Sequence, residues 1–427
     1  SPLLYLVSGV CGTYFVLGLA DRIPWKWPSR IGENALTVMG THQLVLYTIP
    51  GNSSPLWVIG VFLLIAAVEA ALILIINLRS WADREKNEPM PEQAKRQTEL
   101  DILRLAAMLA VIAMHSGGGT GVQIFGRAIS NHAFVALIVW CVPVFFMISG
   151  RFFLDPQRDV TLRRVLTKYV PHIVTAFLSW SAVFTVYYIR SGGYAGLNAF
   201  GILAQFIEGP YHFWYLYTLV GLYLLTPFLR KIAEDDRLLR YFLLLFGVMN
   251  LVTQYLVYLP HVGPVLQDFF DWLHLEAVTG YVGYFMLGYF LWHSKDRISG
   301  RLEAAVYALG MASLFGTAVT EALIAPALQE ADFVKQYMKP NVVLFSAAIF
   351  LFFLSRVAKI RFSERTARVF RTLTELGFGV YCIHALVNEL LPTPGALRLI
   401  RVPCIYLVSL LAAWLLRKIP YIGKKIT

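Results

Sequence analysis

Two ionisable side chains, Arg104 and His115, lie on one apolar stretch at a spacing that would suit a catalytic site. The segment 99–119 reads ELDILRLAAMLAVIAMHSGGG. On an α-helix, their separation of eleven residues corresponds to about 16 Å along the axis. A neutral imidazole is a suitable general base near pH 7, so His115 is the candidate base. The alternatives are a structural, hydrogen-bonded histidine, and an Arg104 that only pairs with Asp101 to fix the helix.

Two later segments also carry polar side chains among apolar ones. Segment 374–391, TELGFGVYCIHALVNELL, places Glu375 and His384 about two and a half helical turns apart. Segment 211–229, YHFWYLYTLVGLYLLTPFL, opens with three side chains that could contact a ligand: His212, Trp214 and Tyr215. A buried glutamate or histidine indicates function, whereas aromatic side chains at the start of a membrane helix also serve as interfacial anchors. Both interpretations stay open.

The composition of the chain is that of a membrane protein. Of its 427 residues, 57% are hydrophobic and only 15% are charged, and the mean hydropathy is +0.61. A soluble domain has about 45–50% apolar and 25% charged residues, so soluble and disordered classes are excluded. Because helices satisfy their own backbone in hydrocarbon, we predict an all-α integral membrane protein. About thirteen transmembrane helices are expected, centred near residues 11, 41, 66, 109, 142, 179, 220, 250, 285, 314, 347, 383 and 407.

The basic residues define the two sides of this protein. The formal net charge is +11, and 30 of the 37 Lys and Arg residues fall on one side of the predicted helices, against six on the other. Basic loops of membrane proteins face the cytoplasm, which predicts a cytoplasmic C-terminus. Since no basic patch lies outside these short loops, the charge does not indicate nucleic-acid binding.

A charged segment divides the predicted helices into two groups. Residues 79–97 are rich in charge and contain proline, as is typical of a cytoplasmic linker. Three predicted helices precede it in 1–78, and ten follow in 98–427. The stretch 31–49 also parallels 374–391, because each places a histidine after glycines and precedes one last apolar segment. This repeat predicts that 1–78 is the tail of another copy of the later domain, a tandem arrangement.

Several kinds of site are not indicated. The four cysteines lie in apolar segments without CxxC spacing: Cys11, Cys141, Cys382 and Cys404. Neither a disulfide framework nor a zinc site is therefore predicted. The glycine-rich run SGGGTG at 116–121 lacks the GK[ST] ending of a phosphate-binding loop. No metal-binding motif and no Ser-His-Asp spacing occurs, so we predict no metal and no acyl-enzyme intermediate.

Five motifs in the later domain occur in the order of a known family. Arg104 and His115 form an Arg-x10-His pattern, and FFxxSG follows in VPVFFMISGRFFL (142–154). A WYLY…GLYL…P pattern lies in 211–229, YFxxG in GYVGYFMLGYFL (280–291), and GxYxxH in ELGFGVYCIH (375–384). With ten predicted helices, the chain from about 98 to 416 resembles the membrane-bound acyltransferase family 3.

The resemblance implies an activity and its substrates. Members transfer an acyl group, most often acetyl, from a cytoplasmic acyl-CoA to a hydroxyl of an envelope glycan or lipid-linked sugar. We therefore expect acetyl-CoA as the donor and a sugar or glycan as the acceptor. His115 would act as the base, and Arg104 would assist at the pantetheine or phosphate end of the donor. Glu375 would be a further catalytic residue in the same cavity.

The cations that follow the FFxxSG motif predict a site for the phosphates of CoA. Phosphate is recognised through charge-assisted hydrogen bonds, and four cations precede Pro171: Arg151, Arg163, Arg164 and Lys168. The family often has Arg-x-x-Arg here, so the individual roles stay open, and an ordinary positive-inside loop is the alternative. The predicted substrate-binding residues are Ser149, His212, Trp214, Tyr215, Tyr223 and His384. The small Ser149-Gly150 pair would also permit close helix packing.

Two other functions are compatible with the same features. A transporter would move a small polar molecule and use the intramembrane histidine and glutamate as a proton relay, with no need of acyl-CoA. A catalytically inactive partner would use the first three helices as a docking surface. The predicted location is the bacterial inner membrane, with the lipid bilayer as the surrounding medium. A homo-oligomer, or packing between tandem copies, stays open.

Overall fold

The described chain is almost entirely helical. The computed structural model describes residues 97–116, 123–124, 127–128, 131–258, 261–275, 278–323, 336–391, 400–420 and 423–427. The predicted helices of 1–78, the linker up to residue 96 and most of the glycine-rich run lie outside the described residues. The strands described are β1 (Gln123–Ile124) and β2 (Arg127–Ala128), which pair antiparallel. The prediction of an all-α protein is confirmed at this level.

The described helices fall into longer and shorter ones. The longer ones are α5 (Thr98–His115), α6 (Asn131–Ile138), α7 (Cys141–Phe153), α9 (Val170–Ser191), α10 (Ala199–Glu208), α11 (Trp214–Glu234), α12 (Asp236–Gln254), α13 (Gly263–Leu273), α14 (Tyr281–Ser294), α15 (Gly300–Leu323), α17 (Pro340–Ser355), α18 (Glu364–Leu390) and α19 (Arg401–Arg417). The shorter ones are α8 (Leu162–Arg164), the π-helical η1 (Val165–Tyr169), the 3-10 helices η2 (Tyr211–Phe213), η3 (Leu256–Tyr258), η5 (Lys295–Arg297) and η6 (Val357–Lys359), and α20 (Gly423–Ile426).

Five helical stretches among the described residues are long and apolar enough to cross a membrane. They are Phe134–Phe153, Leu162–Ser191, Tyr211–Glu234, Gly300–Val319 and Pro340–Lys359. Helix α14, with 14 residues, is shorter than the roughly 17–25 residues of a transmembrane helix, and α19, with 17 residues, lies at the lower limit. The membrane character is therefore supported, and the total of thirteen stays a prediction.

The described residues belong to two compact units, and each is described by itself. Of one unit, the described part is Phe177–Tyr211, which contains α10. Helix α10 begins at Asn198, whose side chain accepts a 2.8 Å hydrogen bond from the Gly201 amide as an N-cap. It ends at Gly209, whose φ of 72° favours glycine. None of the predicted site residues lies in this segment.

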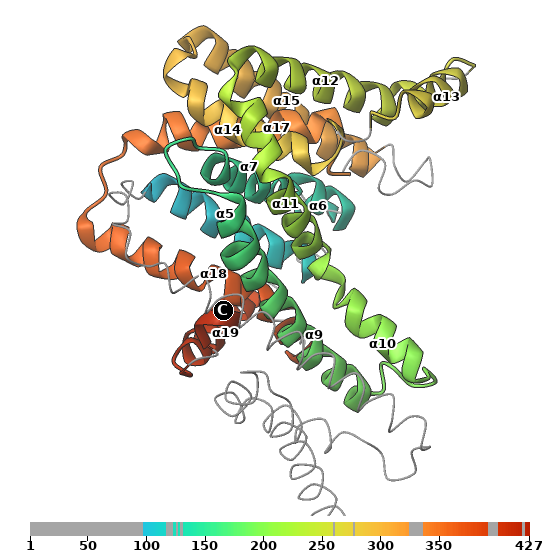
Figure 1. Ribbon diagram of the computed structural model, residues 1–427, viewed down its shortest axis with the longest axis vertical. Coiled ribbons are helices and arrows are strands. Elements are labelled where there is room, and N and C mark those ends of the chain that lie inside the picture. The colour runs from blue at the N-terminus through green and yellow to red at the C-terminus, as the bar shows by residue number, and fades with distance from the viewer. Residues whose placement is uncertain are drawn as a thin grey trace, which may run out of the picture. The chain divides into compact units, whose positions relative to one another are not determined.

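In the other, larger unit, α7 packs closely against α14 (Figure 1). A Cβ atom at Gly150 would lie 1.7 Å from the Phe285 carbonyl oxygen, and one at Gly288 would lie 2.0 Å from that of Met147. Small residues allow membrane helices to approach this closely. The contact supports the structural interpretation of the Ser149-Gly150 pair, because Gly150 carries it.

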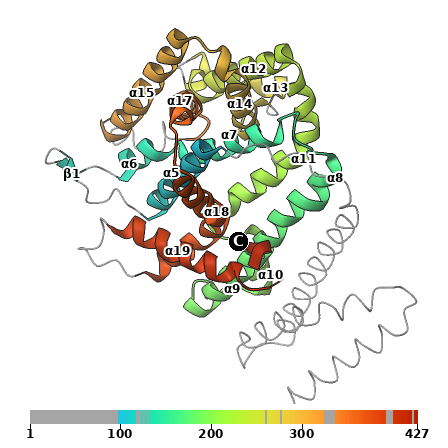
Figure 2. The ribbon, with the colours of Figure 1, turned by 90° about the vertical axis from the view of Figure 1, so that its left-hand side faces the viewer.

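Helix α18 lies beside both α5 and α19 in the same unit (Figure 2). The Thr374 hydroxyl donates to the Asp101 carbonyl oxygen at 3.2 Å, and the Asn388 amide donates to the His115 carbonyl oxygen at 3.2 Å. Both pairs are 273 residues apart in the chain, so α5 and α18 run parallel with a constant register. This register sets the position of His384 relative to His115.

Candidate active site

A cavity of about 820 Å³ in the larger unit is lined mainly by α5, α7, α11 and α18. Nine of the residues predicted to act in a site line it: Arg104, His115, Ser149, Arg164, Lys168, His212, Trp214, Tyr215 and Tyr223. Four others do not: Arg151, Arg163, Glu375 and His384. The fold thus brings together side chains from segments more than 250 residues apart in the sequence.

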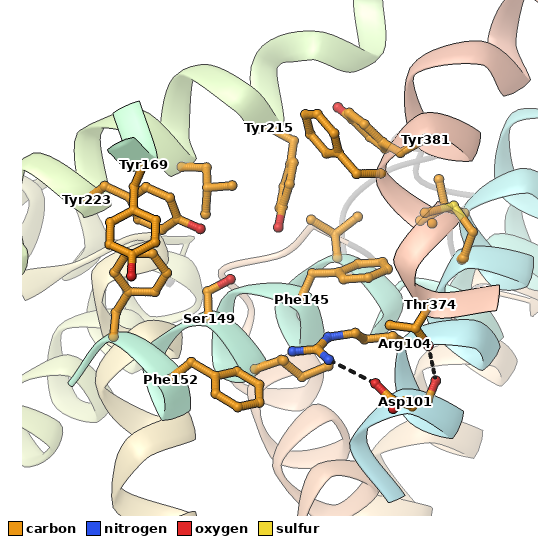
Figure 3. Close-up of a pocket in the computed structure, with 18 of the residues that line it drawn as sticks. Asp101, Arg104, Phe145, Ser149, Phe152, Tyr169, Tyr215, Tyr223, Thr374 and Tyr381 are labelled. Atoms are coloured by element: carbon orange, nitrogen blue, oxygen red, sulfur yellow. Dashed lines mark hydrogen bonds and ion pairs between the residues drawn. The ribbon is translucent and has the colours of Figure 1, made fainter. Parts of the chain in front are cut away.

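Three arginines, Arg104, Arg151 and Arg158, contact the Phe152 ring, and two of them, Arg104 and Arg158, line this end of the cavity. The guanidinium carbons of Arg104 and Arg158 lie 4.8 and 4.3 Å from the centroid of the Phe152 ring. Arg104 also donates to the Asp101 carboxylate at 3.2 Å (Figure 3). Together with Arg164 and Lys168 on the cavity wall, these cations make this end suitable for a multiply charged anion. Sequence reasoning missed Arg158, whose only signal was its place in a basic loop.

A buried ion pair and one further arginine hold the loop that carries Arg158. Arg151 is 4% exposed, donates to the Asp155 carboxylate at 2.8 Å and lies 3.3 Å from the Trp292 ring centroid. Arg230 donates to the carbonyl oxygens of Phe153, Asp155 and Arg158 at 2.8, 2.9 and 3.1 Å. Both arginines therefore shape the wall of the cavity from behind it.

The middle of the cavity is aromatic, with hydroxyl groups among the rings. The rings of Tyr223 and Phe153 stack with centroids 3.9 Å apart, and Tyr215 lies 4.7 Å from Phe146. Figure 3 shows the hydroxyls of Ser149 and Tyr215 turned toward one another within the cavity. Such a wall suits a ligand segment that alternates methylene groups with amides.

Three histidines from distant parts of the chain meet beyond this region. Nδ1 of His115 lies 2.9 Å from Nε2 of His384. The His212 ring centroid is 6.2 Å from that of His115 and 5.0 Å from that of His384. The Tyr381 hydroxyl donates to the His212 carbonyl oxygen at 2.5 Å, which joins η2 to α18. His115 and His212 line the cavity, whereas His384 is fully buried behind them.

Glu375 occupies a different environment from the histidines. Its side chain is 41% exposed, and its carboxylate lies 3.8 Å from the Arg417 guanidinium, so it joins α18 to α19. Within the described residues, no group of three or more His, Cys, Asp or Glu side chains is arranged to hold a metal ion. The polar groups that line the cavity include imidazoles, hydroxyls and cations, together with the carboxylates of Asp101 and Asp159.

Together, the fold and the cavity are those of a helical membrane protein with an internal cavity. Residues 97–418 match the family model described as an acyltransferase domain, and the chain belongs to acyltransferase family 3. It is thus a membrane acyltransferase, as the order of its motifs predicted. No curated protein and no solved structure matches the chain.

Proposed function

We propose that the protein is an O-acyltransferase of the bacterial inner membrane that moves an acyl group, acetyl by preference, from cytoplasmic acyl-CoA to a hydroxyl of an envelope glycan or lipid-linked sugar. The observation that carries this proposal is a single cavity lined by Arg104, Arg158, Arg164 and Lys168 as well as by His115. Cations of this kind suit the phosphates of CoA, and imidazole suits proton transfer.

The separation of Arg104 and His115 along α5 is close to the length of the donor. Arg104 and His115 lie eleven residues apart on α5, which is about 16 Å along a helix. Twelve bonds separate the phosphate oxygen of CoA from its sulfur, equivalent to four extended residues or about 14 Å. A donor with its phosphates near Arg104 and Arg158 would therefore place its thioester near His115.

The proposed reaction is a direct transfer. The acceptor hydroxyl attacks the thioester carbonyl carbon, the new C–O bond forms, and the C–S bond breaks. His115 takes the hydroxyl proton and returns it to the departing CoA thiolate. Loss of such a base costs about 10²–10⁴-fold in rate.

Aromatic rings near the histidines suit an amphipathic acceptor such as a sugar. Trp214 lies 5.2 Å from Tyr281 and 5.6 Å from Tyr337, measured between ring centroids, and both Trp214 and Tyr337 line the cavity. Such rings combine an apolar face with a polar group. Tyr337 donates toward the Met114 sulfur at 3.9 Å, next to His115 in the chain.

Label transfer from radiolabelled acetyl-CoA tests the proposal. Membranes from cells that express the full chain are compared with membranes that lack it, and products are separated into lipid, polysaccharide and soluble fractions. We expect label in a lipid or polysaccharide fraction. Background label with acetyl-, succinyl- and longer acyl-CoA donors would contradict the proposal and favour transport, which requires no acyl-CoA.

A further inference from the structure

The histidine pair on α5 and α18 is connected to a backbone carbonyl group. Nδ1 of His384 lies 2.6 Å from the carbonyl oxygen of Tyr381. A carbonyl oxygen only accepts hydrogen bonds, so this nitrogen must carry a proton. In a neutral imidazole, the other nitrogen then holds the lone pair, and Nε2 of His384 is an acceptor.

The surroundings of His384 favour its neutral form. Its side chain is fully buried. Its two ring nitrogens face the Tyr381 carbonyl oxygen and the His115 imidazole, neither of which carries a negative charge. A buried cation without a carboxylate at its nitrogens would be costly.

The geometry between the two rings is that of a hydrogen bond in the ring planes. Nδ1 of His115 and Nε2 of His384 are 2.9 Å apart, and the ring planes differ by 13°. The ring centroids are 5.2 Å apart, much farther than the two nitrogens, so the rings meet edge to edge. Since Nε2 of His384 accepts, Nδ1 of His115 donates, and the lone pair of a neutral His115 lies on Nε2.

We infer that His384 is a positioning residue, which keeps the proton of His115 on Nδ1 and so makes Nε2 the basic atom. The inference rests on the proposed function, because it specifies the atom of His115 that takes the hydroxyl proton. During the transfer, Nε2 gains that proton and later gives it to the CoA thiolate, while Nδ1–H stays bonded to His384. His384 contacts no substrate in this arrangement.

The parallel register of α5 and α18 supports this role. The Asn388 amide, one turn beyond His384, donates to the His115 carbonyl oxygen at 3.2 Å, and Arg401 donates to the Asn388 side-chain oxygen at 2.9 Å. These bonds fix the backbone of His115 relative to α18, and so the distance between the rings of His115 and His384. An orienting partner for a catalytic histidine requires such a fixed distance.

Two substitutions of His384 test the inference in the full chain. His384→Phe keeps the ring but removes the acceptor, whereas the side-chain oxygen of His384→Gln can accept from Nδ1 of His115. The matched control is His172→Phe, because His172 packs against Phe378 and does not line the cavity. The probe is radiolabelled acetyl-CoA with native membranes, which gives an apparent kcat and an apparent KM. The thermal unfolding midpoint of each variant is measured in detergent.

We expect His384→Phe to lower kcat about 100-fold, the lower range for loss of base catalysis. The KM for acetyl-CoA and the unfolding midpoint should stay near those of the wild type, and His384→Gln should recover most of kcat. A folded Phe variant with wild-type kcat would overturn the inference. A folded Gln variant that is as inactive as the Phe variant would also overturn it. If the Phe variant fails to fold, the kcat of the Gln variant decides: recovery of most of the wild-type kcat supports the inference, and loss of kcat overturns it. If His115→Ala also keeps full activity, the proposed base is wrong, and not only its partner.

Discussion

At the residue scale, the central feature of the cationic end is the Phe152 ring, which the guanidinium groups of Arg104, Arg151 and Arg158 contact. Arg104 is tied to Asp101 at 3.2 Å, so one of its donors is already engaged. Arg158 is 35% exposed and lies 3.9 Å from the Asp155 carboxylate, which leaves a weaker intramolecular pairing. We therefore expect Arg158 to contribute strongly to the binding of the donor phosphates.

Replacing Arg158 with alanine should raise the KM for acetyl-CoA about 10- to 100-fold, the loss expected for hydrogen bonds to a charged group. The kcat should change much less, because the phosphates are remote from the reacting carbon. Steady-state label transfer measures both. Arg163→Ala is the comparison, because Arg163 does not line the cavity. The KM of the Arg163→Ala variant for acetyl-CoA should stay near that of the wild type. A larger effect at Arg163 than at Arg158 would contradict this placement.

The residues that sequence reasoning found are those whose type is unusual for their surroundings. Arg104 and His115 stand out in an apolar helix, so their spacing could be interpreted without a structure. Arg158 is one of several cations in a basic loop, and only the folded loop determines which of them faces the cavity. The partner of His115 is set by the register between α5 and α18. This register is a property of the tertiary fold and cannot be read from the sequence.

At the element scale, the cavity depends on a closely packed helix pair and on one loop. Helices α7 and α14 approach each other through Gly150 and Gly288. The loop after α7 is held by the three carbonyl contacts of Arg230. The Ser149-Gly150 pair in the sequence indicated a close helix contact, since small residues are typical of membrane helix interfaces. Which helix packs against this pair depends on the tertiary fold.

Gly150→Ala should destabilise the protein by about 1–3 kcal/mol, the usual range for overpacking. The added methyl group would overlap the backbone of Phe285, which cannot move as a flexible side chain could. The thermal unfolding midpoint in detergent measures the effect. Gly221→Ala is the matched control, because a Cβ there meets no atom within 4 Å. Equal midpoints for the two variants would show that the α7–α14 contact is not tight.

Arg230→Lys should raise the KM for acetyl-CoA, because a single ammonium group cannot reproduce the planar fork that binds three carbonyl oxygens. The effect should act through the position of Arg158. A double-mutant cycle with Arg158→Ala measures this coupling, and Arg230→Lys should add little in that background. Fully additive effects on KM would contradict a positioning role for Arg230.

At the scale of the whole molecule, the cationic end of the cavity lies on the same side as Arg417, the last residue of α19. Thr374 bonds the Asp101 backbone, and the adjacent Glu375 pairs with Arg417. The side predicted to be cytoplasmic from loop charges is therefore also the side of Arg104, as the proposed cytoplasmic donor requires. The predicted domain boundary near residue 98 stays a prediction. The proposed tandem origin of 1–78 stays a prediction.

A shortened chain of residues 90–427 should fold and transfer label with an unchanged KM for acetyl-CoA. The reason is that the family match and all of the described residues that line the cavity lie within it. Purification, the unfolding midpoint and label transfer check this expectation. A shortened chain that folds but transfers no label would assign the first three predicted helices to the active unit.

The most direct test of the account is label transfer by His115→Ala from radiolabelled acetyl-CoA, alongside His172→Ala. We predict that His115→Ala lowers transfer by about 10²–10⁴-fold while its unfolding midpoint and expression stay near those of the wild type. His172→Ala should keep most of the activity, because His172 does not line the cavity. Wild-type transfer by a folded His115→Ala variant, or an equal loss in both variants, would contradict a base at His115.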